Sequence, residues 1–166
     1  MDPTNQMHIA TKSSKIDISK EIVTKKVAEQ LANVIKKNFT LLFYGNIGVG
    51  KTTFIRYFIN QLQKKNKLEI SEVPSPTFNL IHEYKINSII IRHFDLYRIK
   101  DKKDLDNLGI NEDVKDYVRL IEWPEILGQN IESTFSLQFE YDEKLENRYL
   151  IISSNIDFDF NEFEKI

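Results

Sequence analysis

A glycine-rich stretch at residues 45–53 has the clearest chemistry in this sequence. It reads Gly-Asn-Ile-Gly-Val-Gly-Lys-Thr-Thr, and its first eight residues fit the phosphate-binding pattern G-x-x-x-x-G-K-[S/T]. In such a loop, successive backbone N–H groups face an anion, and the helix that follows adds its N-terminal amides. Lys51 would neutralise the β- and γ-phosphates, and the Thr52 hydroxyl is a hard oxygen ligand for Mg²⁺. The residues predicted to bind a nucleoside triphosphate with Mg²⁺ are Gly45, Gly48, Val49, Gly50, Lys51, Thr52 and Thr53.

Two acidic residues each follow an apolar run. Asp95 comes after the run at 89–94, and Glu122 comes after the run at 118–121. A phosphate-binding loop needs a carboxylate at the end of a neighbouring strand, to hold Mg²⁺ or to position water. A single acid after a strand is commonly a turn residue or a cap, but two of them downstream of the loop make both candidates. The sequence leaves open which carboxylate touches Mg²⁺ and which orients water.

The pattern of apolar residues predicts the elements that position these groups. A compact apolar run at 39–44 ends in glycine, as a buried strand does, and 52–63 follows as a helix with one apolar side. Residues 118–123, stopped by Pro124, are predicted to form another buried strand. The other expected elements are a short strand at 15–18, a helix at 19–36 with Ser19 as its N-cap, a hairpin of strands at 78–85 and 88–94, short helices at 102–108 and 111–117, an antiparallel pair at 134–141 and 148–154, and a covering tail at 157–166.

These elements predict a single α/β domain with a P-loop NTPase-like fold. We expect a mixed central sheet with helices on both faces. The 166 residues suffice for one core of ordinary size and not for two. Residues 1–14 are predicted to be a disordered or frayed start, and residues 15–166 are predicted to form the domain.

The composition narrows the class of protein. With 41% hydrophobic and 29% charged residues, the chain resembles soluble globular domains. Its 23 Lys and Arg against 25 Asp and Glu give no reason to expect strong, autonomous binding to nucleic acid. The lack of cysteine excludes disulfides, zinc-thiolate sites and thiol catalysis. No run approaches the about 18 apolar residues of a membrane span, and residues 1–19 lack a signal-like apolar segment. We therefore expect a cytoplasmic protein with no membrane contact.

Four segments together resemble the TsaE family. They are the loop at 45–53, Ser-Pro-Thr-Phe at 75–78, His-Phe-Asp-Leu-Tyr-Arg at 93–98 and Glu-Trp-Pro-Glu at 122–125, in the order and approximate spacing of that family. The resemblance covers roughly residues 15–154. It implies an ATPase required for making threonylcarbamoyladenosine on tRNA. One departure is Asn46, where the family usually carries aspartate.

The resemblance also implies roles for single residues. Thr77 resembles a switch threonine that orders its loop around γ-phosphate and Mg²⁺, the alternative being a plain Pro-Thr turn. Asp95 resembles the Walker B acid, and Glu122 resembles a further acid at the metal or the attacking water. Trp123, the only tryptophan, is either core packing or a contact beside the nucleotide, and the family pattern favours the contact. Arg148 and the turn at 19–24 are candidates to reach the base or ribose, or are solvated surface.

By the same resemblance, the partners are the threonylcarbamoyl transferase subunit TsaD and its non-catalytic companion TsaB. ATP turnover would reset that complex between rounds, and tRNA would be involved only indirectly. The cofactors implied are ATP and Mg²⁺.

Three other functions remain as alternatives. A GTPase switch is suggested by Asn-Lys-Leu-Glu at 66–69, but this segment ends in Glu and precedes the Asp95 strand. A small-molecule kinase would need an arginine-rich lid, whereas 100–116 is mostly acidic and lysine-bearing. A nucleotide-binding module without turnover would use both acids for Mg²⁺. His82 and His93 are predicted to be strand residues, since neither has a second metal ligand at helical spacing.

Overall fold

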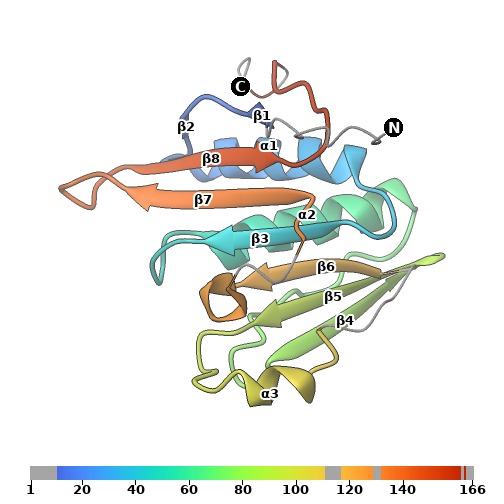
Figure 1. Cartoon of the computed structure of the whole chain (residues 1–166). Helices are drawn as coiled ribbons and strands as arrows, with labels where there is room; N and C mark the ends of the chain where they lie inside the picture. The colour runs from blue at the N-terminus through green and yellow to red at the C-terminus, as the bar shows by residue number, and fades with distance from the viewer. Residues whose placement is uncertain (1–10, 111–116, 129–131, 162, 164–166) are drawn as a thin grey trace, which may run out of the picture.

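The fold is described from a computed structural model that covers residues 11–110, 117–128, 132–161 and 163 (Figure 1). The strands are β1 Thr11–Lys12, β2 Ile16–Asp17, β3 Thr40–Tyr44, β4 Ile81–Ile86, β5 Ile89–Asp95, β6 Tyr117–Glu122, β7 Phe135–Tyr141 and β8 Arg148–Ser154. They form one sheet in the order β1-β8-β7-β3-β6-β5-β4, with β2 also paired to β8. Strand β3 runs parallel to β6 and β7, and β5 runs parallel to β6, whereas the other pairs are antiparallel. The predicted mixed sheet is confirmed.

Helices cover both faces of this sheet. They are α1 Glu21–Val34, α2 Lys51–Lys65, α3 Lys103–Asp106 and a 3₁₀ helix, η1, at Pro124–Leu127. The two long helices lie side by side on one face (Figure 1). On the opposite face, Leu105 of α3 and Leu127 of η1 pack with Leu42, Phe94 and Ile121 of the sheet. The predicted arrangement of helices on both faces is therefore confirmed.

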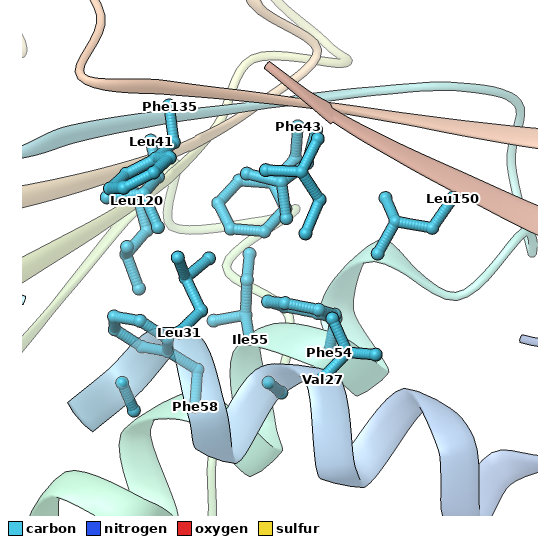
Figure 2. Packing of buried hydrophobic residues seen from close by; sticks show 14 of the residues in the cluster. Val27, Leu31, Leu41, Phe43, Phe54, Ile55, Phe58, Leu120, Phe135 and Leu150 are labelled. Carbon is cyan, nitrogen blue, oxygen red and sulfur yellow. The ribbon is translucent and has the colours of Figure 1, made fainter. Parts of the chain in front are cut away.

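The main core lies between the long helices and the sheet. Helix α1 directs Val27 and Leu31 inward, and α2 directs Phe54, Ile55 and Phe58, at the spacing of one helical face (Figure 2). These side chains meet buried residues of β3, β6, β7 and β8. Burying each such side chain is worth about 1.5–3 kcal/mol. This packing fixes α2 against β3, the two elements that flank the glycine-rich loop.

Three aromatic rings pack directly beneath the glycine-rich loop. Phe43 of β3 and Phe54 of α2 have ring centroids 5.8 Å apart, and Phe139 of β7 lies 6.3 Å from Phe43 and 5.8 Å from Phe54. All three are essentially fully buried. Aromatic pairs with this geometry add about 0.5–1.5 kcal/mol beyond their area burial. The cluster therefore makes a rigid base for the loop.

The beginning of α1 differs from its prediction. Ser19 was expected to be the N-cap, but the cap residue is Lys20, and no side chain caps the helix. The Ser19 hydroxyl instead accepts a hydrogen bond from the Arg148 backbone N–H at 2.9 Å. Strand β2 pairs with β8, so Ser19, which follows β2, lies beside Arg148, the first residue of β8. Its hydroxyl therefore bonds to the strand rather than to the helix.

Other boundaries also differ. Residues 78–80, predicted to begin a strand, form a turn in which Leu80 has a positive φ of 65°, so β4 begins at Ile81. Helix α3 is shorter than the predicted 102–108, since Leu108 and Gly109 form a turn. The predicted helix at 111–117 lies outside the described residues except for Tyr117, which begins β6.

The two ends of the described chain pack against the β7–β8 pair. Thr11–Lys12, predicted to be part of a frayed start, pairs with Ser153 and Ser154, whereas residues 1–10 lie outside the described part. In the predicted covering tail, Phe158 packs against Phe135 with centroids 5.1 Å apart. Within the described residues, no helix has the length and apolar character to cross a membrane.

Candidate functional site

Three parallel strands end at the same edge of the sheet. Strand β3 leads into the loop at 45–50, β5 ends at Asp95 and β6 ends at Glu122. The strand register places Asp95 beside Glu122, and Glu122 beside Phe43. Ligands of open α/β sheets bind at the carboxyl ends of the strands. The predicted loop and both predicted acids therefore converge at the position where a ligand is expected.

The loop at 45–50 has backbone conformations that glycine supplies. Gly45 has a φ of 130°, and a Cβ added there would lie 2.5 Å from the backbone oxygen of Phe139. Gly50 has a φ of 116° and is the N-cap of α2. Side chains other than glycine rarely adopt such φ values. The loop consequently folds over the aromatic cluster and delivers the first turn of α2 to the sheet edge.

Lys51, the first residue of α2, is held against its own loop. Its Nζ donates to the backbone oxygens of Gly45 at 2.6 Å and Asn46 at 2.9 Å. The same Nζ lies 3.9 Å from the centre of the Trp123 ring, a cation–π distance. Burial lowers the pKa of Lys51, and the negative charges of Glu122, Glu125 and Asp95 oppose that shift.

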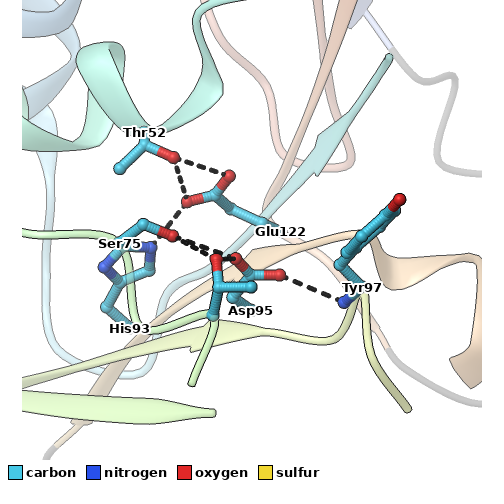
Figure 3. Close-up of polar contacts among 7 residues, drawn as sticks. Thr52, Ser75, His93, Asp95, Tyr97 and Glu122 are labelled. Carbon is cyan, nitrogen blue, oxygen red and sulfur yellow. Dashed lines mark hydrogen bonds and ion pairs between the residues drawn. The ribbon is translucent and has the colours of Figure 1, made fainter. Parts of the chain in front are cut away.

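Thr52 and Glu122 form the first of two hydroxyl–carboxylate pairs (Figure 3). The Thr52 hydroxyl lies 2.9 Å from Glu122 Oε1 and 3.0 Å from Oε2. Behind the carboxylate, His93 Nε2 lies 2.9 Å from Oε1. Glu122 is only 2% exposed, so its orientation is fixed by these two partners.

Asp95 makes the second pair, with hydroxyls from the segment before β4. Its Oδ2 accepts hydrogen bonds from Thr77 at 2.6 Å and from Ser75 at 3.0 Å. Its Oδ1 accepts the backbone N–H of Tyr97 at 3.0 Å (Figure 3). The Ser75 and Thr77 hydroxyls also lie 2.7 Å apart. Asp95 thus ties the segment that carries Thr77 to the end of β5.

A cavity of about 250 Å³ opens between these pairs. Its wall is formed by Ile47, Gly48, Gly50, Lys51, Thr52, Thr53, Ser75, Thr77, Asp95, Tyr97, Glu122 and Trp123. The Trp123 and Tyr97 rings lie 4.8 Å apart. Trp123 is half-buried, and it also packs against the apolar cluster between the sheet and α3. It therefore contributes both to core packing and to the cavity wall.

Most predicted site residues line this cavity, but three do not. Gly45 lies against the backbone of Phe139, and Val49 is buried in the main core. Arg148 lies at the beginning of β8, where its Nη2 donates to the Ser19 backbone oxygen at 3.1 Å. Its Nη1 would lie 4.0 Å from a Cβ on Gly50. Arg148 and the 19–24 turn are therefore brought together beside the loop, outside the cavity wall.

Sequence reasoning missed three residues of this site. The sequence pattern indicates only a strand role for His93, although strand periodicity places it on the same face of β5 as Asp95. Ser75 stood in the Ser-Pro-Thr-Phe segment, two residues from Thr77, a spacing that also allows both hydroxyls to reach one acceptor. Tyr97 gave no signal of its own, because nothing local predicts that its ring lies beside Trp123.

The donor set of the cavity fits Mg²⁺. The Thr52 hydroxyl and the Glu122 and Asp95 carboxylates are hard oxygen donors that line one cavity. Among the described residues, no group of three or more His, Cys, Asp or Glu could hold a metal by itself. Mg²⁺ binds through one or two carboxylates together with phosphates and waters, and the Thr52, Glu122 and Asp95 oxygens are donors of that kind.

Comparison with known proteins gives a consistent set of relatives. Residues 18–150 match the family described as "Threonylcarbamoyl adenosine biosynthesis protein TsaE". Proteins named tRNA threonylcarbamoyladenosine biosynthesis protein TsaE include one from Haemophilus influenzae, which is 35% identical over 136 residues, covering 80% of this chain and 82% of the relative. The one from Aquifex aeolicus is 32% identical over 116 residues, or 66% of this chain and 80% of the relative.

The Rickettsia felis protein of the same name is 39% identical over 110 residues, or 66% of this chain. The match spans 62% of that relative and 61% of its Rickettsia conorii counterpart. Among solved structures, Bacillus subtilis YdiB superposes with a TM-score of 0.63 at 23% identity, covering 95% of this chain and 93% of that one. The superposition supports the fold, and the sequence matches support the family. The chain belongs to the TsaE family, which is named for threonylcarbamoyladenosine biosynthesis.

Proposed function

We propose that the protein is a Mg²⁺-dependent ATPase that assists a partner complex in the threonylcarbamoyladenosine modification of tRNA. One observation carries the proposal. The Thr52 hydroxyl, at the first turn of α2 beside Lys51, is hydrogen-bonded to Glu122, and both line one cavity with Asp95 and Thr77. Positioning and charge neutralisation provide most of the catalysis of phosphoryl transfer, and these are the groups that provide them.

The chain's own residues then have separate tasks. The backbone of the loop and Lys51 bind the phosphates, once Lys51 leaves the Gly45 and Asn46 oxygens that now hold it. Thr52 and Glu122 offer oxygens to Mg²⁺, which would neutralise phosphate charge. Asp95, at the end of the adjacent strand, orients Thr77 and is the second acid for metal or water.

The proposed partners are TsaD and TsaB, and contact with tRNA is indirect. The formal charge of −2 supports indirect contact with tRNA, because a chain without excess cations depends on partner proteins to bind a polyanion. The relatives' names refer to tRNA modification, so the protein would act with that machinery, in the cytoplasm.

The GTPase alternative is weakened by where residues 66–69 lie. Asn66 is the C-cap of α2, a 15-residue helix whose other end meets the loop. At 1.5 Å per residue, about 22 Å separates this segment from the phosphate site. The Asn66 side chain also accepts a hydrogen bond from Asn87 at 2.8 Å. A guanine-reading segment would need to lie beside the nucleotide.

Phosphate release separates the remaining possibilities. The chain would be incubated with ATP or GTP, with Mg²⁺ or with EDTA, alone and with TsaD and TsaB. We expect hydrolysis of ATP that requires Mg²⁺, exceeds that of GTP and rises with the partners. Lys51→Ala serves as the inactive control. If ATP binds but no phosphate appears under any condition, the protein is a binding module and the proposal is wrong.

A further inference from the structure

We propose that His93 is a positioning residue that holds the Glu122 carboxylate in the orientation needed for Mg²⁺-dependent hydrolysis. This inference rests on the proposed function and adds a residue outside the cavity wall to its machinery. His93 is not among the residues that line the cavity, so it would act through Glu122.

The contact is short, buried and directed. His93 Nε2 lies 2.9 Å from Glu122 Oε1 (Figure 3), and the His93 side chain is 0% exposed against 3% for Glu122. A carboxylate only accepts hydrogen bonds, so the proton lies on Nε2 of His93. Away from water, a charge-assisted bond of this kind is stronger than an exposed one.

Glu122 needs a donor besides Thr52. The Thr52 hydroxyl lies within hydrogen-bond distance of both carboxylate oxygens, yet it has a single hydrogen and serves one acceptor at a time. His93 approaches Oε1 from the opposite side of the carboxylate (Figure 3). When the Thr52 oxygen turns to a metal, His93 still fixes Glu122. Outer partners of metal-binding carboxylates commonly have this role.

The position of His93 is otherwise hard to explain. Its Nδ1 is buried and has no hydrogen-bond partner among the described residues. Its neighbours on the same face of the sheet include Ile91 of β5 and Leu120 of β6, both fully buried. An apolar side chain would satisfy packing there without leaving a polar atom unpaired. Among the residues that the structure describes, Glu122 is the only polar partner of this side chain.

The fold also provides a matched control. His82 of β4 is the register partner of His93 in the adjacent antiparallel strand. Its Nε2 pairs with Asn79 at 3.1 Å, and the residue is half-buried at the sheet edge. His82→Leu therefore removes a histidine from the same pair of strands without touching Glu122.

The test compares His93→Leu, His93→Gln and His82→Leu in single-turnover hydrolysis at saturating ATP and Mg²⁺, with TsaD and TsaB present. We expect His93→Leu to lower the rate about tenfold to a hundredfold, the usual loss for outer partners of a metal site. Metal-free ATP binding should stay at the wild-type level. His93→Gln, whose amide can donate to Glu122, should recover most of the rate, and His82→Leu should behave as wild type.

Three outcomes would overturn the inference. The first is a folded His93→Leu with the wild-type rate, and the second is an equal loss in His93→Leu and His93→Gln, which would indicate packing alone. The third comes from nitrogen NMR of histidine-labelled wild type, in which the His93 ring would carry its proton on Nδ1. This spectrum needs neither turnover nor a stable variant. If wild type shows no Mg²⁺-dependent hydrolysis, the proposed function fails, whereas an Nε2 proton would still support the His93–Glu122 contact.

Discussion

Thr52 and Glu122 are 70 positions apart in the sequence, yet the Thr52 hydroxyl lies 2.9 Å from Glu122 Oε1. The same relationship recurs between Thr77 and Asp95, whose oxygens lie 2.6 Å apart. Each hydroxyl that could face a metal is thus paired with a carboxylate on a neighbouring strand.

Lys51→Ala should abolish tight ATP binding. The phosphates would then face only backbone dipoles, and a charge-assisted contact of this kind is worth about 1.5–3 kcal/mol, or about tenfold to a hundredfold in affinity. Titration with a fluorescent ATP analogue measures the loss. Lys64→Ala, on the exposed side of the same helix, is the control. Wild-type affinity in Lys51→Ala would show that the loop is only a structural turn.

Thr52→Ala should weaken binding of Mg²⁺-ATP far more than binding of metal-free ATP, since only the metal complex uses the hydroxyl. Affinities measured in Mg²⁺ and in EDTA give the two values. Thr52→Ser retains the hydroxyl and should retain the difference between them. Equal losses with and without Mg²⁺ would remove Thr52 from the metal site.

Trp123 should report the nucleotide state by its fluorescence. Its ring lies 3.9 Å from Lys51 Nζ, and Lys51 must leave its present partners to reach phosphate. As the only tryptophan, it gives a signal without background, which Trp123→Phe would remove. Unchanged emission at saturating Mg²⁺-ATP would mean that the residue serves packing alone.

Glu122→Ala and Asp95→Ala should reduce hydrolysis more than they reduce ATP binding. The loop amides and Lys51 would still hold the phosphates, while misplaced metal or water would raise the barrier by about 3–5 kcal/mol, or about two to four decades in rate. Single-turnover hydrolysis with the partners present measures this. Glu69→Ala, an exposed acid in the segment that follows α2 and lies away from the cavity, is the control. A parallel collapse of binding would instead assign the acid to Mg²⁺ in the ground state.

Gly45→Ala should destabilise the fold by about 1–3 kcal/mol, because a side chain at a positive φ of 130° is strained and its Cβ would meet the Phe139 backbone oxygen at 2.5 Å. Urea denaturation followed by circular dichroism measures the change. Asn46→Ala, at the exposed neighbouring position, should leave the midpoint near wild type. A stable Gly45→Ala protein would show that the loop can be rebuilt away from β7.

The parts of the fold that depend on neighbouring residues could be predicted from the sequence. The strand at 39–44, the loop and the helix that follows are encoded by a local apolar pattern and by glycines at required positions. The β4–β5 and β7–β8 pairs are also connected by short segments, so their pairing follows from proximity along the chain. Asp95 and Glu122 lie at strand ends, as predicted, because these strands end where the apolar runs end.

Contacts between distant segments could not be predicted. Nothing near Ser19 indicates that its hydroxyl serves Arg148, 129 positions away, rather than the helix that begins next to it. His93 resembles any strand residue until the register of β5 on β6 brings it beneath Glu122. Trp123 has a φ of 58°, a left-handed conformation that tertiary packing imposes and no local pattern signals.

The place of β3 in the sheet also constrains how the chain acquires its function during synthesis. β3 is made early, yet both strands that flank it, β6 and β7, come more than 70 residues later in the chain. On the ribosome, the glycine-rich loop would emerge long before Glu122 and Phe139, the residues that it packs beside, have been synthesised. We expect nascent chains of the first hundred or so residues to be unable to retain ATP. The ability to bind nucleotide would then appear only late in synthesis and in a single step. A truncated product could therefore not compete with the full chain for the partners in a nucleotide-bound form.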